Sequence, residues 1–151
     1  MSTPPPRRER ILILVSNAHE DAARIAAMLA TQLTFEDLIV ELVSLDAGRA
    51  PLLSDYDAVV IGACTRPRNH DRALTDYIRE HLTELAELPA FWFCVGHASV
   101  YSESAARLTA RRTGWQPTAT WSFTDATPSQ RPEVEGFAQL IADEVPGLLE
   151  A

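Results

Sequence analysis

The stretch from Ile11 to Ala30 constrains the fold of this chain more than any other segment. It begins with the apolar run ILILV, which is too short for a helix and rich in β-branched side chains, so it predicts a buried strand. Ser16 and Asn17 follow, and both residue types favour helix N-termini. The helix predicted after them carries apolar residues at helical spacing, namely Ala22, Ile25, Met28, Leu29 and Leu33. A strand that leads straight into a helix is typical of doubly wound α/β folds, in which phosphate groups dock at the intervening turn.

The rest of the chain continues this alternation. Further strands are predicted at residues 38–45, 56–63, 90–96 and 118–123. Helices are predicted at 71–87 and 101–113, and a last helix is predicted to bury Val134, Phe137, Ala138, Ile141 and Val145. Because strands and helices alternate, we expect an all-parallel sheet with helices on both faces, a three-layer α/β sandwich.

The composition of each strand predicts its place in the sheet. The first, third and fourth strands are almost entirely apolar, as expected for strands buried on both faces. The second strand contains Glu41 and Ser44, and the fifth alternates apolar with hydroxyl residues, so both are predicted at the edges. The resulting order is 2-1-3-4-5, with a switch point between strands one and three. A ligand is expected beyond the carboxyl ends there, among the loops at 16–22, 64–70 and 97–102.

Size and composition limit the class of protein. The chain has 151 residues, of which 9–151 are predicted to form one domain and 1–8 a disordered N-terminal tail. A net charge of −8 argues against nucleic-acid binding. Two cysteines are too few for a disulfide framework, and no apolar stretch is long enough for a signal peptide or a membrane span, so a cytoplasmic protein is expected. No cluster of Cys, His and carboxylate residues has metal-site spacing, so no metal is expected.

Four segments of the chain resemble one known group of proteins. They are residues 11–30, 54–74 and 88–100 and the tripeptide at 115–117, and the stretch DYDAVVIGA is the most specific of them. The pattern resembles flavodoxin-like proteins and, among them, the menaquinone-dependent protoporphyrinogen oxidase group. The resemblance implies a flavodoxin-like fold with FMN held by three loops. It also implies an oxidoreductase or electron-transfer role, in which electrons pass from a porphyrinogen to a quinone or to a redox partner protein.

The resemblance also implies which residues bind the cofactor. The first loop would contribute Ser16, Asn17, Ala18, His19 and Ala22. The second loop would pack beside the flavin ring with Ala63, Cys64, Thr65 and Arg66. The third loop would contribute Gly96, His97 and Tyr101. No catalytic residue is assigned.

The first loop departs from the phosphate-binding pattern of this family, Ser/Thr-x-x-x-Gly-x-Thr. Glu20 occupies the glycine position and Ala22 the position of the last threonine, whereas Ser16 carries over. Two unit charges about 5 Å apart interact by roughly 3 kcal/mol at an effective dielectric of about 20, whereas a helix N-terminus returns only about 0.3–2 kcal/mol. A carboxylate facing the phosphate would therefore exclude it, and one facing outward would be harmless. Asn17 and Glu20 can equally form a capping box of the helix itself.

Other residues of the loops also have two interpretations. Arg66 and Arg68 could pair with an anionic ligand, or they could be solvated at a loop tip. Cys64 could be a reactive thiol beside these arginines or a small buried residue, and Cys94 is predicted to be part of the core. Tyr101 could stack on a flavin or staple the start of the next helix.

Three functions follow from these observations. The first is an FMN-binding redox protein, and the second is a flavodoxin-like domain that has lost FMN and serves as a binding or interaction module. The third, a receiver domain that accepts phosphate on an aspartate, is poorly supported because the strand ends read Ser16-Asn17 and Gly62-Ala63 rather than carrying an acidic cluster.

Overall fold

The computed structural model describes residues 9–15, 20–45, 52–64, 72–96, 110–111 and 113–145. Its five-stranded parallel sheet has the order β2-β1-β3-β4-β5, as the sequence predicts. The strands are β1 (Arg10–Val15), β2 (Ile39–Ser44), β3 (Ala58–Cys64), β4 (Ala90–Val95) and β5 (Ala119–Phe123). The helices are α1 (Glu20–Phe35), α2 (Arg72–Glu80), α3 (Leu82–Ala86) and α5 (Arg131–Glu144), with short 3₁₀ helices η2 (Leu53–Asp55) and η3 (Pro128–Gln130).

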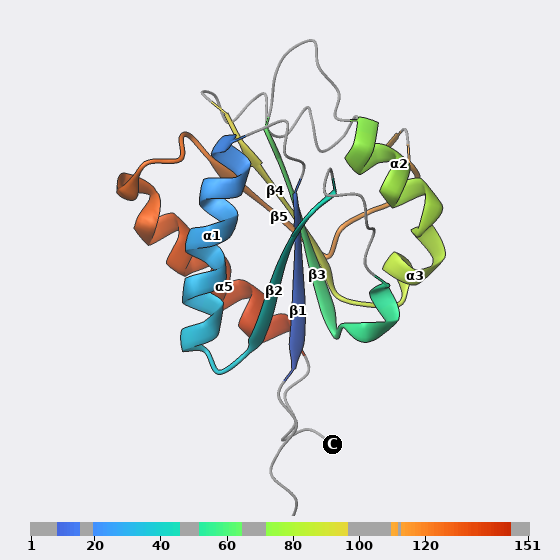
Figure 1. The fold of residues 1–151 in the computed structure, drawn as a ribbon, viewed down its shortest axis with the longest axis horizontal. Coiled ribbons are helices and arrows are strands. Elements are labelled where there is room, and N and C mark those ends of the chain that lie inside the picture. The colour runs from blue at the N-terminus through green and yellow to red at the C-terminus, as the bar shows by residue number, and fades with distance from the viewer. Residues whose placement is uncertain are drawn as a thin grey trace, which may run out of the picture.

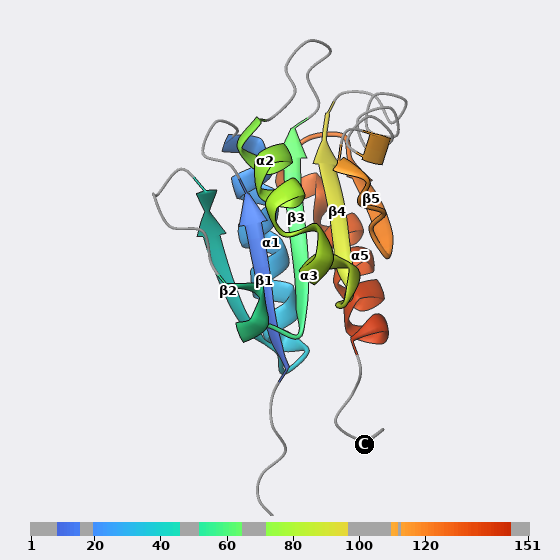
Figure 2. The ribbon, with the colours of Figure 1, turned by 90° about the vertical axis from the view of Figure 1, so that its right-hand side faces the viewer.

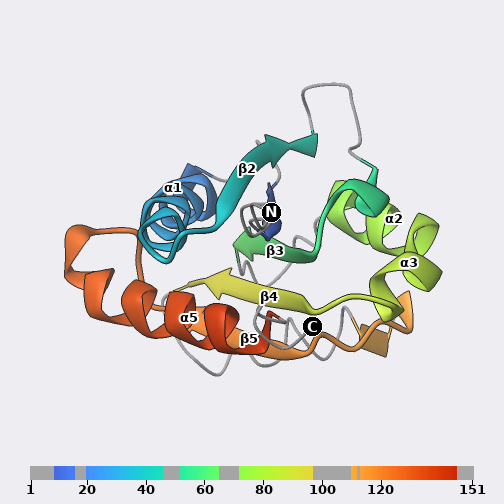
Figure 3. The same cartoon turned by 90° about the horizontal axis from the view of Figure 1, so that it is seen from below.

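The helices form two layers, one on each side of the sheet. Figure 1 looks onto β2, with α1 and α5 on one side of the sheet and α2 and α3 on the other. Figure 2 shows the sheet from its α2/α3 side, and Figure 3 shows both layers from below. Among the described residues this is the three-layer arrangement that alternating strands and helices predict.

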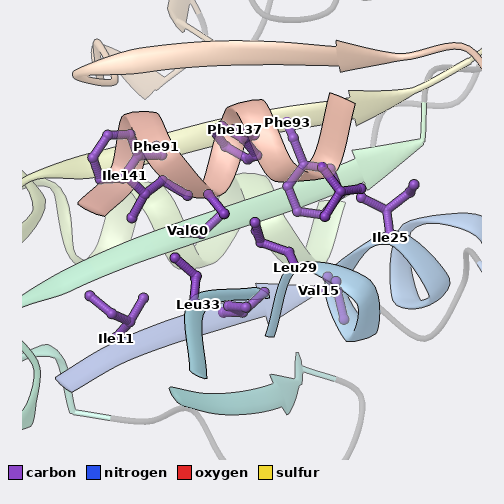
Figure 4. Packing of buried hydrophobic residues seen from close by; sticks show 14 of the residues in the cluster. Ile11, Val15, Ile25, Leu29, Leu33, Val60, Phe91, Phe93, Phe137 and Ile141 are labelled. Carbon is purple, nitrogen blue, oxygen red and sulfur yellow. The ribbon is translucent and has the colours of Figure 1, made fainter. Parts of the chain in front are cut away.

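The two faces of the sheet pack into separate cores. Alternate residues of β1 enter alternate cores, because successive strand side chains point to opposite faces. Ile11, Ile13 and Val15 join the core under α1 and α5, whereas Leu12 and Leu14 join the core under α2 and α3. Figure 4 shows part of the first core, where side chains of α1 and α5 meet those of the sheet. The tryptophans divide in the same way: Trp92 and Trp115 are buried in the second core, and Trp121 packs against the first.

Three aromatic rings pack together in the α1/α5 core. Phe93 of β4 packs edge-on against Phe123 of β5, with ring centroids 5.8 Å apart, and against Phe137 of α5, with centroids 6.1 Å apart. On its other side the Phe93 ring lies directly over Gly62 of β3, where a Cβ atom would come within 2.1 Å of the ring. Gly62 therefore leaves the space that the ring of the neighbouring strand occupies.

The edge strand β2 is preceded by a tight helix end. Leu38 donates its amide to Leu33 at 3.3 Å and Asp37 donates to Thr34 at 3.1 Å, and Asp37 has a φ of 63°. This is the Schellman arrangement, in which a residue in the left-handed conformation ends the helix and apolar residues on either side of it meet. Leu33 and Leu38 both belong to the α1/α5 core. The turn thus brings β2 back alongside β1.

The helix predicted at 71–87 is divided in two. α2 ends at Glu80 and α3 begins at Leu82, because His81 has non-helical backbone angles of −116° and 21°. The His81 ring stacks on Tyr77 with centroids 4.1 Å apart, and its Nδ1 lies 2.9 Å from the Tyr77 carbonyl oxygen. The apolar spacing of this helix predicts burial of Leu74, Tyr77, Ile78, Leu82 and Leu85. All of these are buried except Leu82, which is only half-buried, as is Met28 of α1.

A polar cluster joins the first three strands on the α2/α3 face. Tyr56 donates its hydroxyl to the Glu41 carboxylate, and the guanidinium of Arg10 lies 3.9 Å from Glu41 and 5.4 Å from the Tyr56 ring centroid. The backbone amide of Arg10 donates to Asp57 at 2.8 Å. Burial of the phenol, followed by its hydrogen bond to Glu41, raises the pKa of Tyr56 to about 12.

Alkaline titration is expected to reveal the contribution of this phenol to stability. The folded pKa is raised above the ordinary value of 10, so the stabilisation is complete below pH 10 and is lost as pH rises from 10 to 12. Below pH 10 the free energy of unfolding of the wild type should exceed that of Tyr56→Phe by about 1.5 kcal/mol, the lower end of the range for a hydrogen bond to a charged partner. Urea unfolding at pH 8 to 12 checks this. A stability difference that stays constant across the range would contradict it.

Candidate functional site

The carboxyl ends of β1, β3 and β4 lie side by side at one end of the sheet, the carboxyl edge, which is distinct from the edge strands β2 and β5. The strand register aligns Val15 with Gly62, and Cys64 with Val95. Figures 1 and 2 show this edge uppermost, with α1 beginning beside it. β1 lies between β2 and β3, so the chain leaves β1 in one direction and β3 in the other. This is the switch point at which doubly wound sheets bind ligands.

The structure describes four of the twelve residues predicted to hold a cofactor, namely Ala22, Ala63, Cys64 and Gly96. All four lie at this edge, in β3, just after β4 or in the first turn of α1. The others lie outside the described residues: Ser16, Asn17, Ala18, His19, Thr65, Arg66, His97 and Tyr101. Arg68 lies outside them as well.

The first turn of α1 presents backbone donors and negative charge together. α1 begins at Glu20, so the amides of Glu20, Asp21 and Ala22 belong to the turn whose N–H groups have no partner within the helix. The Ala22 side chain is fully buried in the α1/α5 core, so any ligand contact there is through the backbone. Asp21 is exposed, and Glu20 brings a second acidic residue into the same turn. The positive end of the helix dipole is therefore already matched by acidic residues of the chain itself.

The end of β3 faces the α2/α3 core. The Ala63 side chain is buried there, and β3 ends at Cys64. The other cysteine, Cys94, is buried in the same core and accepts a hydrogen bond from Trp92 Nε1 at 2.8 Å. This confirms the prediction that Cys94 is a core residue.

The end of β4 is held to β5. The Gly96 amide donates to the Phe123 carbonyl oxygen at 2.9 Å, so this N–H group is already used within the protein. A ligand beside Gly96 would meet its carbonyl oxygen or its Cα rather than its amide. The sequence contained no indication of this bond, because it depends on how β5 aligns with β4.

The floor beneath this edge is aromatic on the α1/α5 side. Phe93 and Phe123 are fully buried at the carboxyl ends of their strands and pack on Phe137. The strands were predictable from the sequence, but this aromatic cluster was not. The one residue in the sequence that could have indicated the cluster was Gly62, because a ring from the neighbouring strand fills the space that its Cβ would take.

The site thus combines parallel strand ends and a helix N-terminus with a cluster of buried aromatic rings. Within the part of the chain that the structure describes, no group of three or more His, Cys, Asp or Glu residues is arranged to hold a metal ion. In the same described ranges, no helix has the length and apolar character needed to cross a membrane. The arrangement is suited to an organic ligand that carries an anionic group, provided that the acidic residues of α1 turn away from it.

Comparison with known protein families identifies this arrangement. The family model described as Flavodoxin domain matches residues 12–131, which is most of the chain. The chain therefore belongs to the flavodoxin domain family.

Two curated relatives are similar over part of the chain. A protoporphyrinogen IX dehydrogenase (quinone) from Leishmania major is 29% identical over 87 residues, which are 57% of this chain and 38% of the relative. The protein of the same name from Escherichia coli is 28% identical over 86 residues, which are 57% of this chain and 48% of the relative. The matched segment spans less than half of either relative.

Solved structures of flavodoxins share the whole fold. The two-electron reduced flavodoxin of Megasphaera elsdenii has a TM-score of 0.69 at 15% identity, covering 88% of this chain and 98% of its own. Oxidised flavodoxin 1 of Bacillus cereus also has a TM-score of 0.69, at 11% identity, covering 91% of this chain and 99% of its own. A flavodoxin from the domain Archaea has a TM-score of 0.66 at 14% identity, covering 90% of this chain and 98% of its own. At these identities the similarity establishes the flavodoxin-like fold.

Proposed function

We propose that this flavodoxin-domain protein binds FMN at the carboxyl edge of its sheet and acts in electron transfer. The observation that carries the proposal is the meeting of the α1 N-terminus with the β1/β3 switch point. Membership of the flavodoxin domain family and the resemblance to quinone-dependent dehydrogenases support the same role.

The described residues suit different parts of the cofactor. The backbone amides of the first α1 turn would donate hydrogen bonds to the phosphate, together with the hydroxyl of Ser16 in the preceding loop. The ends of β3 and β4, at Cys64 and Gly96, would flank the flavin ring, with the loops that follow them. FMN supplies the electron-accepting group when bound, and the protein's contribution is to position it on a rigid sheet.

A more specific form of this role would be oxidation of a porphyrinogen with a quinone as the acceptor. Its support is the similarity to two relatives with that name, over less than half of their length. It can be tested by mixing the FMN-loaded protein with protoporphyrinogen IX and menaquinone and following porphyrin fluorescence. Oxidation above the rate of free FMN would support this form of the proposal.

A second candidate is a flavodoxin-like domain that has lost FMN and serves as an interaction module. The acidic first turn of α1 favours it, because Glu20 and Asp21 bring negative charge to the place where a phosphate would dock. The two candidates differ in a single measurable property, retention of the cofactor.

FMN retention tests the proposal directly. The purified full chain is mixed with excess FMN and passed through gel filtration, and the visible spectrum of the protein peak gives the molar ratio. A ratio near one, with midpoint potentials displaced from those of free FMN, is the expected result. A colourless protein peak, with no quenching of tryptophan fluorescence during an FMN titration, would reject FMN binding and favour the interaction module.

A further inference from the structure

The exposed apolar side chains of this protein gather around one edge of the sheet. Among the described residues, four large apolar side chains are exposed: Phe35 at 76%, Leu52 at 67%, and Ile39 and Leu42 at 43% each. Ile39 and Leu42 belong to β2, Phe35 ends the helix before it, and Leu52 adjoins η2. Figure 3 shows β2 at the edge of the sheet, between α1 and the segment that carries η2.

The apolar side chains flank β2 on both faces. The register pairs Leu42 with Ile13, so it lies on the α1 face, and pairs Ile39 with Arg10, so it lies on the α2/α3 face. Leu52 is linked to the same region, since it accepts the Asp55 amide in the turn before Tyr56, and the Tyr56 hydroxyl reaches Glu41 of β2. An added strand would therefore meet apolar side chains above and below the sheet.

Part of the β2 backbone also points away from β1, to a side where no strand of the described residues pairs with it. The Ile39 amide donates to the Glu9 carbonyl oxygen of the β1 side at 2.9 Å, so Ile39 directs its backbone groups inward. Because these groups alternate along a strand, Val40, Leu42 and Ser44 direct theirs to the open edge. No strand among the described residues lies beyond them.

The two edges of the sheet differ in their protection. β5, at the opposite edge, exposes the hydroxyl residues Thr120 and Ser122, and its described residues include no exposed large apolar side chain. Neither β2 nor β5 contains lysine or proline, the residues that commonly prevent edge pairing, so the difference between the two edges lies in their exposed apolar side chains. The single charge of β2, on Glu41, is turned towards Tyr56 and Arg10.

The charge around β2 is mostly negative. Among the described residues around β2, Glu36, Asp37, Glu41 and Asp55 are exposed, against one guanidinium, that of Arg10. We propose that the β2 edge docks an extended segment of a partner protein in which basic residues alternate with apolar ones. The segment adds as a sixth strand, with its apolar side chains on the α1 face beside Leu42 and its basic side chains on the α2/α3 face, which Glu41 shares.

The same charges disfavour a second copy of this chain. Edge-to-edge pairing of two β2 strands would bring the acidic residues of both copies together, and each chain has a net charge of −8. Like charges across an interface suppress association, whereas opposite charges favour it. The partner strand is therefore expected to be basic.

Amide exchange tests the geometry of the complex. The probe is a capped nine-residue peptide of alternating arginine and valine, added to the isotope-labelled full chain. At saturation the amides of Val40, Leu42 and Ser44 should exchange at least tenfold more slowly, whereas those of Ile39, Glu41 and Val43 are already protected by β1. A peptide with glutamate in place of arginine should give no such protection. A peptide that is N-methylated at the amides facing β2 should give none either.

Lysine substitutions test the surface itself. Ile39→Lys with Leu42→Lys should weaken peptide binding at least tenfold, because both positions are exposed and each adds a repelling charge at the edge. Thr120→Lys with Ser122→Lys adds the same charge to β5, and should weaken binding less than threefold. An unchanged urea midpoint verifies that both variants fold.

Other results would overturn the proposal. These are no peptide binding by the wild type, equal losses in the two lysine variants, or protection of amides outside β2. A concentration-dependent dimer in sedimentation that disappears in Ile39→Lys with Leu42→Lys would assign the edge to a second copy instead. FMN retention concerns the carboxyl ends of the strands, whereas the peptide test concerns the outer side of β2. Failure of FMN binding would therefore leave the peptide test unaffected.

Discussion

Replacement of Gly62 by alanine is expected to destabilise the protein by about 3 kcal/mol, the upper part of the range for overpacked cores. The new Cβ would lie 2.1 Å from Phe93 Cζ and 2.4 Å from its Cε1, distances at which the ring must move. Phe93 is fully buried and is held by Phe123 and Phe137, so it has no space into which to retreat. Urea unfolding followed by tryptophan fluorescence measures the loss.

A smaller residue at position 93 should relieve this clash. Phe93→Leu alone leaves a cavity and costs stability, but Gly62→Ala with Phe93→Leu should be less destabilised than the sum of the single changes by about 1–2 kcal/mol. Gly136→Ala is the matched control: its Cβ would lie 3.2 Å from the half-exposed Trp121, which can move, and alanine favours the helix. Gly136→Ala should stay within about 1 kcal/mol of the wild type. Strict additivity of the first pair would show that the ring is not the obstacle.

Removal of the two charges from the first turn of α1 is expected to tighten FMN binding at least tenfold. Glu20→Gln with Asp21→Asn leaves the length of the helix and its backbone donors in place and removes two negative charges from the turn at which the phosphate is proposed to dock. A tenfold change corresponds to about 1.4 kcal/mol, less than half of the interaction between two unit charges about 5 Å apart at a dielectric of about 20. Fluorescence titration of FMN against wild type and variant gives the two dissociation constants.

Two controls separate the phosphate from the ring and from total charge. Riboflavin lacks the phosphate, so its affinity should change less than twofold in the same variant. Glu80→Gln with Glu84→Gln removes two exposed carboxylates, one from the last residue of α2 and one from α3, and should leave FMN affinity nearly unchanged. An equal gain for riboflavin would show that the turn contacts the ring and not the phosphate.

The order of the strands was predictable from the sequence because burial on two faces and burial on one leave different patterns. The central strands are apolar throughout, whereas β2 contains Glu41 and β5 alternates Trp121 with hydroxyl residues. The division of the helix at His81 was not predictable, because the apolar spacing continues through it. At the break His81 has non-helical backbone angles and its ring stacks on Tyr77, and neither feature is encoded in the apolar spacing.

The candidate site was predictable in position but not in detail. Strand order and a helix after β1 place it at the carboxyl edge without any knowledge of side-chain packing. The role of Gly62 could not be derived from the sequence. It leaves room for the ring of Phe93, which is distant in sequence and becomes its neighbour only through the β3/β4 register. The bond between Gly96 and Phe123 depends on long-range register in the same way. Most of the loop residues predicted to contact a cofactor lie outside the described residues and stay predictions.

The division of the tryptophans between the two cores gives each layer its own fluorescent reporter. Trp92 and Trp115 lie 6.3 Å apart, centroid to centroid, on the α2/α3 side, and Trp121 stacks on Phe137 on the α1/α5 side. A variant with Trp121 alone would report on one layer, and a variant that keeps the other pair would report on the opposite one. Coincident unfolding curves would mean that the sheet couples both layers into a single cooperative unit. Separated curves would identify the helix layer that unfolds first, and therefore the face of the sheet that is uncovered first beneath the carboxyl edge.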